Sequence, residues 1–243
     1  MAKKITCLYG KKSVLERLVV DPGSIKGIFV RENFNDSHIL NEIKKRNVPS
    51  RTASEKELIR IKRADRVQGI VAEVNRFEYV DFDDLINEPN QSKRSLVFLD
   101  GVNDPHNLGS IIRITACIGN FAIVIPKHES AQVNDTVIHV ASGGENYTPV
   151  ATVNNIATAL IKAKSSGYWA AGAVVEGGDE IGKAKIPFPV ACVLGSEGKG
   201  IGHAVSKQLD IKITLPMRGA QLSFNVAMAC AIICHEIDKQ RPR

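Results

Sequence analysis

The sequence predicts an α/β protein in two parts, a small basic domain followed by a larger domain with a parallel sheet. Strand-like and helical patterns alternate along the chain, as in α/β folds. From residue 95 onward the strand-like runs are continuously apolar, which is typical of a parallel sheet covered on both faces. Residues 1–76 contain 17 Lys and Arg against 9 Asp and Glu, a net charge of +8, whereas residues 77–243 have a net charge of −2.

This charge distribution favours a polyanion-binding module attached to a nearly neutral domain. An ordinary lysine-rich solvated surface is the alternative.

Composition excludes other classes of protein. With 243 residues, 44% of them hydrophobic, the chain can bury a substantial core. It has no run of about 18 apolar residues, so no membrane span is expected.

The N-terminus and the cysteines predict a cytoplasmic location. The first residues are basic but lack the apolar segment of a signal peptide. The five cysteines include no CxxC pair, and most lie in apolar runs. We therefore expect reduced thiols in a cytoplasmic protein and no metal site.

Residues 1–76 are expected to form the small domain. Asp36 is a good helix N-cap, and Ser54 with Glu57 has the spacing of a capping box. The expected elements are a helix over 9–20, a strand over 25–30, a helix over 36–46, a helix over 54–62 and a strand over 68–74.

Residues 77–94 change from acidic to polar and are expected to be a linker, and residues 95–243 form the larger domain. Its expected strands lie over 95–102, 121–126, 168–175, 189–195 and 211–217. Its expected helices lie near 107–118, 154–166, 203–208 and 224–238.

Three unusual segments follow strands of the larger domain. They are NDPHNLG (103–109), which precedes Arg113, LGSEGKGI (194–201) and LPMRGAQLSFNVA (215–227). Ligands of open parallel sheets bind at the carboxyl ends of strands. We therefore expect the three segments to form one site.

The second segment is glycine-rich but does not fit the common phosphate loops. A P-loop needs Ser or Thr after its lysine, whereas Gly200 follows Lys199, and the dinucleotide fingerprint GxGxxG is absent from the first turn of the domain. The glycines 195, 198, 200 and 202 would let the backbone approach a flat ligand closely. A simple tight turn is the alternative. Glu197 is the loop's only acid.

Polar residues on two apolar helices also point to a site. Asn225 lies in the first turn of an apolar helix, where its amide needs a partner. Arg113 would be a buried cation on another apolar helix, and its structural alternative is an ion pair with Asp104 or Glu197. Ser223 could simply cap its helix.

Together, the three segments resemble the motifs of the SpoU/TrmH class of S-adenosylmethionine-dependent RNA 2'-O-ribose methyltransferases, which have the SPOUT fold. The resemblance covers residues 95–240. Its motifs are NLGSIIR (107–113), LGSEGKGI (194–201), and Pro216-Met217 followed by SFNVA (223–227).

The basic domain resembles the substrate-binding extension of the subgroup that methylates a guanosine of 23S ribosomal RNA. The residues that carry this likeness are YGKKSV (9–14) and VQGI (67–70). A tRNA methyltransferase of the same class is the alternative.

The resemblance implies a trefoil-knotted sheet, S-adenosylmethionine as cofactor, RNA as substrate and a homodimer. It implies cofactor contacts from the backbone of Gly195, Leu215 and Phe224, with Met217 nearby. Leu194 and Ile201 belong to the same cofactor set.

The resemblance also implies catalytic roles. In such enzymes an arginine at the position of Arg113 is cast as the general base. Because a guanidinium resists deprotonation, we instead expect Arg113 to hold the target phosphate and polarise the ribose hydroxyl, oriented by Asn107 and Glu197. Ser223 and Asn225 would hold the ribose or the loop. Two departures stand out: Phe224 replaces the usual leucine, and residues 139–150 lack the usual lysine and alanine of that loop.

Two other classes of protein compete with this prediction. A non-catalytic RNA-binding or ribosome-assembly factor of the same fold would not need Arg113 or Asn225, and both are present. An NAD-dependent oxidoreductase would need the dinucleotide fingerprint and a ribose-binding acid, and both are absent.

Overall fold

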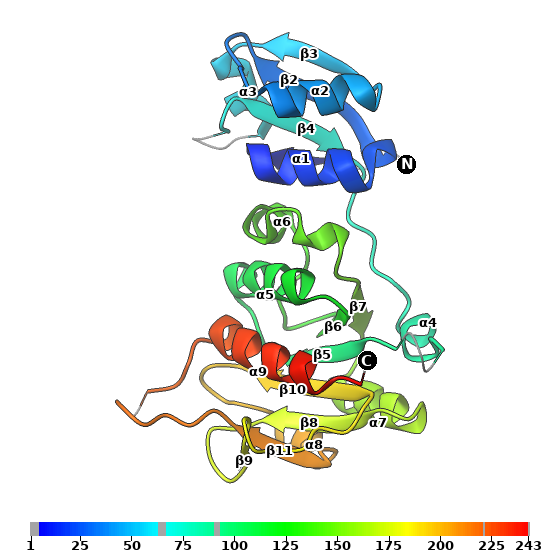
Figure 1. Ribbon diagram of the computed structural model, residues 1–243, viewed down its shortest axis with the longest axis vertical. Coiled ribbons are helices and arrows are strands. Elements are labelled where there is room, and N and C mark those ends of the chain that lie inside the picture. The colour runs from blue at the N-terminus through cyan, green and yellow to red at the C-terminus, as the bar shows by residue number, and fades with distance from the viewer. Residues whose placement is uncertain (1–4, 63–66, 90–92, 221, 243) are drawn as a thin grey trace. The chain divides into compact units, whose positions relative to one another are not determined.

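The computed structural model describes residues 5–62, 67–89, 93–220 and 222–242 (Figure 1). The chain folds into two compact units. Unit 1 comprises Met1–Glu78 and Val133–Tyr147, and unit 2 comprises Tyr79–Gln132 and Thr148–Arg243. The segment 133–147 thus belongs to the first unit although it lies far along the chain. The domain boundaries at 76 and 94 stay a prediction.

Unit 1 contains a four-stranded sheet in the order β1-β4-β2-β3, antiparallel except for the parallel pair β2 and β3. Its elements are β1 (Thr6–Tyr9), α1 (Lys11–Val20), η1 (Pro22–Ser24), β2 (Ile25–Arg31), α2 (Ser37–Lys45), β3 (Ser50–Ala53), α3 (Glu55–Lys62), β4 (Ile70–Val74), α6 (Asp135–Ala141) and η2 (Gly144–Asn146). The strands β1 and β3 and the helix α6 were not expected from the sequence.

The predicted helix starts of unit 1 are confirmed by their hydrogen bonds. The carboxylate of Asp36 accepts a bond from the backbone N–H of Ile39 at 3.3 Å, which caps α2. The hydroxyl of Ser54 accepts a bond from the N–H of Glu57 at 3.3 Å, just before α3. Each bond satisfies an N–H group of the first helical turn that has no partner within the helix.

The main core of unit 1 is completed by the segment 133–147. Ile138 of α6 is buried in the same cluster as Leu8, Ile28 and Ile70 from the sheet, and Val133 packs against it. This core lies on the side of the sheet that α1 and α2 cover. A smaller cluster on the other side includes Leu58 of α3.

A buried ion pair also holds this segment to α1. Nη2 of Arg17 lies 3.4 Å from Oε1 of Glu145, and the two side chains are 11% and 0% exposed. Oε2 of Glu145 accepts a bond from the N–H of Gly143 at 3.1 Å. A Cβ on Gly143 would lie 2.5 Å from Cβ of Glu16, so α1 and this turn touch at a position that admits glycine alone. Burial raises the pKa of Glu145, despite the opposing effect of Arg17.

Unit 2 contains a seven-stranded parallel sheet in the order β7-β6-β5-β10-β8-β11-β9. Its elements are α4 (Phe82–Ile86), β5 (Ser95–Asp100), α5 (Pro105–Ile118), β6 (Phe121–Pro126), β7 (Val150–Val153), α7 (Ile156–Ser165), β8 (Trp169–Ala173), β9 (Asp179–Glu180), β10 (Val190–Gly195), α8 (His203–Ser206), β11 (Ile211–Thr214) and α9 (Val226–Gln240). The predicted parallel α/β sheet is confirmed. The expected linker contains α4, and β7 and β9 were not expected.

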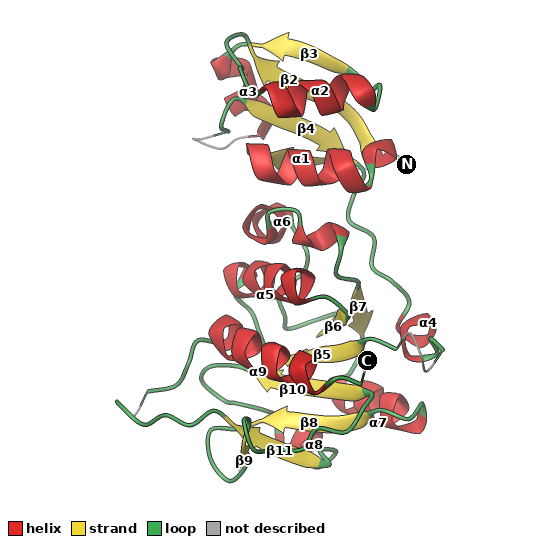
Figure 2. Cartoon of the chain, viewed as in Figure 1, coloured by secondary structure: helices red, strands yellow, loops and turns green. Residues whose placement is uncertain are grey.

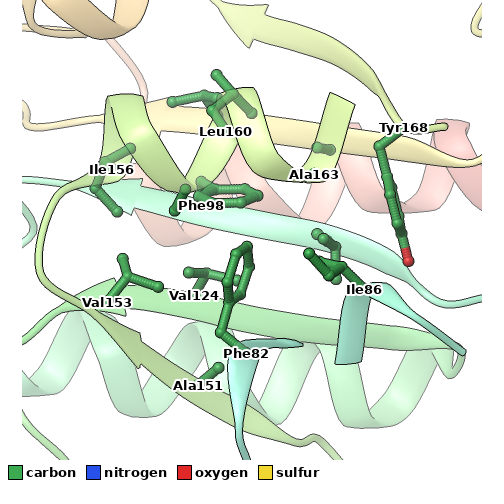
Figure 3. Packing of buried hydrophobic residues seen from close by; sticks show 14 of the residues in the cluster. Phe82, Ile86, Phe98, Val124, Ala151, Val153, Ile156, Leu160, Ala163 and Tyr168 are labelled. Carbon is green, nitrogen blue, oxygen red and sulfur yellow. The ribbon is translucent and has the colours of Figure 1, made fainter. Parts of the chain in front are cut away.

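Helices cover both faces of this sheet, as the apolar strands predict (Figure 2). On one face, Phe98 of β5 and Val124 of β6 pack with Phe82 of α4 and with Ile156 and Leu160 of α7 (Figure 3). On the other face, α5 and α9 pack against each other and against β6 and β10. Because all strands run in one direction, their carboxyl ends meet at one edge. Within the described residues, no helix has the length and apolar character needed to cross a membrane.

The buried carboxyl of Glu145 makes the stability of the protein depend on pH. Burial raises the pKa of Glu145 above its ordinary value of 4.5. The protonated carboxyl therefore contributes its full stability to the folded protein below about pH 4.5, and this contribution is lost as pH rises through the pKa of Glu145 in the folded state. The variant Glu145→Gln, which cannot ionise, is expected to gain stability relative to the original protein over that window. Urea unfolding of both proteins from pH 4.5 to 8 measures this difference. Glu78→Gln, at an exposed carboxylate of the same unit, is the control, and parallel pH curves for Glu145→Gln and the original protein would contradict the expectation.

Candidate active site

Three loops meet at the carboxyl edge of the unit 2 sheet. They follow β5, β10 and β11; the first leads into motif 107–113 in α5, the second contains motif 194–201, and the third leads into α9 through motif 223–227. The loops after β5 and β10 are joined directly, because the carboxylate of Asp100 accepts a bond from the N–H of Gly202 at 2.7 Å. The prediction that the sheet gathers the motif segments at one edge is confirmed.

The side chains of Asn107, Glu197 and Asn225 form one hydrogen-bonded cluster. Nδ2 of Asn225 donates to Oε1 of Glu197 at 2.7 Å and to Oδ1 of Asn107 at 2.9 Å. Nδ2 of Asn107 donates to the same Glu197 oxygen at 3.4 Å, as does the backbone N–H of Val226 at 3.4 Å. One residue from each motif therefore takes part, and the predicted need of Asn225 for a partner is met.

Asn225 is also the N-cap of α9. Its Oδ1 accepts a bond from the N–H of Ala227 at 2.9 Å, and the helix begins at Val226. The alternative that Ser223 caps this helix is therefore wrong. The amide succeeds as a cap because its oxygen satisfies the first helical turn while its nitrogen donates to Glu197 and Asn107.

Arg113 is exposed on α5, so the expectation of a buried cation is wrong. Its neighbours at the helix positions that face the core, Ile111 and Ile112, are fully buried instead. Among the described residues, no ion pair joins Arg113 to Asp104 or Glu197. Asp104 caps α5 through the N–H of His106 at 2.8 Å. The guanidinium is thus available to solvent.

A pocket of about 360 Å³ opens beside this cluster. Its walls are mostly apolar and come from the ends of β8 and β10, the loop before α9, and α9 itself. Of the residues predicted from the sequence, Leu194, Gly195, Glu197, Leu215, Met217, Ser223 and Phe224 line it. Asn107, Arg113 and Asn225 do not line it. Ile201 does not line it either, because its side chain packs against the core beneath α7.

Part of the pocket wall was not predicted from the sequence. Ala173–Val175 at the end of β8 and Ala229 and Ile233 of α9 line it as well. The end of β8 could have been found, because every strand of a parallel sheet presents its carboxyl end to the same edge. The two α9 residues look like ordinary core residues in the sequence.

The second motif needs its first glycine for close backbone packing. A Cβ on Gly195 would lie 2.1 Å from the carbonyl carbon of Gly200 and 2.4 Å from the N of Ile201. Ser196 and Gly200 exchange two backbone hydrogen bonds, at 2.8 and 3.2 Å, which close the loop on itself. The loop thus folds back on its own strand and turns its backbone toward the pocket.

Comparisons with known proteins agree with this arrangement. A model of the SpoU rRNA Methylase family matches residues 94–235, and a model described as RNA 2'-O ribose methyltransferase substrate binding matches residues 7–80. YacO of Bacillus subtilis, named as a TrmH family tRNA/rRNA methyltransferase, is 32% identical over 99% of this chain and 98% of its own. A relative with the same family name from Staphylococcus haemolyticus is 31% identical over 96% of this chain and 95% of its own.

Solved structures share the fold. An AdoMet-bound rRNA methyltransferase from Sinorhizobium meliloti matches with a TM-score of 0.78 at 22% identity, over 98% of this chain and 88% of that chain. The SpoU methyltransferase AviRb from Streptomyces viridochromogenes, in complex with AdoMet, also matches with a TM-score of 0.78, at 18% identity over 96% and 89% of the two chains.

These findings define the class of protein: the chain is an RNA methyltransferase. More particularly, the chain belongs to the SpoU family. Its relative YacO carries the family name TrmH.

The pocket fits S-adenosylmethionine in size and chemistry. Leu194, Leu215, Met217 and Phe224 offer apolar surface to an adenosine group, and the folded loop offers backbone N–H and carbonyl groups. Glu197 is the one carboxylate among the described lining residues and Lys199 is a cation of the same lining, so the carboxylate would offer negative charge to a sulfonium bound on its side of the pocket.

The variant Gly195→Ala should therefore lose affinity for S-adenosylmethionine. The added methyl would collide with backbone atoms and force the loop off its strand, so we expect a loss of at least about tenfold, or about 1.4 kcal/mol. Gly182→Ala is the matched control, because a Cβ there meets no atom within 4 Å and the residue does not line the pocket, and it should bind within about twofold of the original protein. Calorimetric titration measures both, and equal affinities for the two variants would refute the close-packing argument.

Proposed function

We propose that the enzyme methylates the ribose 2'-hydroxyl of a guanosine in 23S ribosomal RNA. The observation that carries the proposal is the cluster in which Glu197 joins the three motif loops beside the pocket. The match of residues 7–80 to a substrate-binding model for RNA 2'-O ribose methyltransferases supports the ribose position. The excess of basic residues in the same part of the chain supports a structured RNA substrate.

The reaction needs a ribose hydroxyl to lose its proton while it faces an electrophilic methyl group. S-adenosylmethionine supplies that methyl on a positively charged sulfur. Arg113 is exposed on α5, the helix that also carries Asn107 of the cluster. We assign it to bind the phosphate of the target nucleotide and to stabilise the developing alkoxide. Holding the two reactants in line supplies much of the remaining rate.

Asn107 and Glu197 act on the loops rather than on Arg113 itself in this proposal. Their hydrogen bonds go to Asn225 and Val226, so they fix the start of α9 against α5 and the glycine loop. In this proposal Asn225 holds the loop, and Ser223, a residue of the pocket lining, holds the ribose through its hydroxyl. The backbone of Gly195, Leu215 and Phe224 would contact the cofactor.

We further propose that the enzyme acts as a homodimer with a trefoil-knotted sheet. Phe224, Met228 and Ile232 recur every fourth residue and are 44%, 64% and 41% exposed. Met228 and Ile232 lie one turn apart on α9 and Phe224 lies just before the helix, and this exposed apolar surface fits a second copy of the chain. The position of β10 between β5 and β8 means that a late strand enters the middle of the sheet, which is consistent with a knot.

The choice of RNA can be tested directly. Purified enzyme and tritiated S-adenosylmethionine are incubated with deproteinised 23S RNA, 16S RNA or bulk tRNA from a strain that lacks the gene. We expect label in 23S RNA alone, and nuclease digestion should release it as 2'-O-methylguanosine. Label in tRNA would favour the alternative substrate. Label on a base would overturn the ribose assignment, and a lack of label in every RNA would favour the non-catalytic alternative.

The role of Arg113 can be separated from that of a general base by Arg113→Lys. Loss of one donor to a developing oxyanion costs about 10²- to 10³-fold in kcat, and we expect this loss to persist as pH rises. If Arg113 were the base, the lysine variant would speed up toward the amine's ordinary ionisation near pH 10.4. Cys117→Ala, at an exposed position one turn further along α5, is the control and should keep full activity. Single-turnover rates from pH 7 to 10 distinguish the two mechanisms.

A further inference from the structure

Unit 1 exposes a row of cationic side chains at one margin of its sheet. β3 is the last strand in the order β1-β4-β2-β3, so it pairs on one side only (Figure 1). Arg51 lies on this strand and its side chain is 55% exposed. Arg31, at the end of the neighbouring strand β2, is 49% exposed.

Arg51 is held in a fixed position. Its guanidinium lies over the ring of Phe29, 4.6 Å from the ring centre, and Nη2 lies 2.6 Å from Oε1 of Glu57. A guanidinium stacked on an aromatic ring keeps outward-facing N–H groups while its rotation is restricted. Such a group loses less conformational entropy when it binds a ligand.

The charged side chains around Arg51 include more cations than carboxylates. Arg31 pairs with Glu55 at 3.3 Å, and Arg51 pairs with Glu57. The hydrogen bond from Arg51 lowers the pKa of Glu57, and the charge of Arg60 lowers it further by a smaller amount. Arg60 therefore lies near the same carboxylate. We call Arg31, Arg51, Lys56 and Arg60 the arginine patch.

Lys56 and Arg60 are exposed one turn apart on α3, and neither forms an ion pair among the described residues. The arginine patch therefore has four cations against the two carboxylates that pair with them. The excess positive charge is divided between the β3 edge, the end of β2 and the exposed face of α3.

Several other cations of the unit serve local purposes. Lys44, Lys45 and Arg46 end α2, where positive charge complements the helix dipole, and two of them share Glu42. Lys11 pairs with Asp36, and Lys12 pairs with Glu16. Charged side chains on an edge strand also discourage pairing with other chains. Protection of the edge would explain a charged residue on β3. It would not explain why Arg51 stacks on Phe29 or why α3 carries Lys56 and Arg60.

We propose that the arginine patch binds the phosphodiester backbone of the substrate RNA. The inference rests on the proposed function for the identity of that RNA, and it assigns the phosphate contacts to one margin of unit 1. Guanidinium groups suit this ligand because their paired N–H groups match two phosphate oxygens. The patch gives unit 1 an orientation on the RNA but reads no base.

The test compares two variants of the full chain that remove equal charge. The patch variant carries Arg51→Gln, Lys56→Gln and Arg60→Gln, and the matched control carries Lys44→Gln, Lys45→Gln and Arg46→Gln. Binding of fluorescently labelled, deproteinised 23S RNA fragments is measured from 50 to 300 mM KCl. The patch variant should bind about 10- to 100-fold more weakly, and its slope of log K against log salt should fall by about 2. The control's slope should change by less than about 1.

A milder pair of variants separates the guanidinium fork from charge alone. Arg51→Lys keeps the charge but loses the planar fork, and we expect RNA binding several-fold weaker at an almost unchanged salt slope. Arg46→Lys is its control and should bind like the original protein. Because these changes are small, they keep the proposal testable if a triple variant fails to fold.

Several outcomes would overturn the proposal. Equal weakening in both triple variants would mean that net charge alone matters, and unchanged binding in the patch variant would place the phosphate contacts elsewhere. Association of the patch variant into oligomers, with RNA affinity retained, would assign the patch to edge protection. Calorimetric binding of S-adenosylmethionine and the urea midpoint should stay unchanged in every variant. If the original protein methylates RNA normally while the patch variant binds RNA equally well, only this inference fails. If the original protein modifies no RNA, the proposed function fails.

Discussion

One oxygen atom holds the candidate site together. Oε1 of Glu197, in the loop after β10, accepts hydrogen bonds from Asn107 in the first turn of α5 and from Asn225 and the backbone of Val226 at the start of α9. Their common acceptor fixes the start of α9 relative to α5 and to the glycine loop. The shape of the pocket beside them depends on this arrangement.

The parallel sheet makes this arrangement possible and the glycine loop refines it. Strands β5, β10 and β8 are direct neighbours, so their carboxyl ends deliver the first two motifs and one pocket wall to one edge. Gly195 then allows the loop to lie on its own strand at a distance that no side chain permits. The result is an apolar slot with a single acidic lining residue in the described chain. Such a slot offers apolar surface to a flat group, while Glu197 and Lys199 supply one charge of each sign to its lining.

Much of the site followed from residue types and spacing, and the exceptions have physical causes. Asn225 could be singled out because it begins an apolar helix, and its amide does find partners in Glu197 and Asn107, although the residue is exposed rather than buried. The prediction that Arg113 is buried was wrong. Its apolar sequence neighbours suggested a buried helix face, but Arg113 itself lies on an exposed face of α5. Ser223 was a reasonable cap by type, but the residue that caps α9 must also reach Glu197, and only the fold shows which residue does.

The fold of unit 2 was easier to predict than that of unit 1. Long apolar runs identify central parallel strands, whereas the short strands β1 and β3 contain polar or half-exposed residues and leave little periodic signal. The role of 133–147 could not be predicted at all. Its contacts with α1 are made across more than a hundred residues of chain, and a single sequence contains no record of such pairing.

That distant segment bears on how the protein could have been assembled in evolution. A gene fusion that joined an existing RNA-binding module to a methyltransferase would deliver a module whose core is already complete. Here Ile138 and the partner of Arg17 are encoded between β6 and β7, inside the methyltransferase sequence. Exchange of the first 78 residues between relatives would leave a hydrophobic gap and a stranded guanidinium. The two stretches must therefore change together, and their co-inheritance keeps the module from moving freely between enzymes.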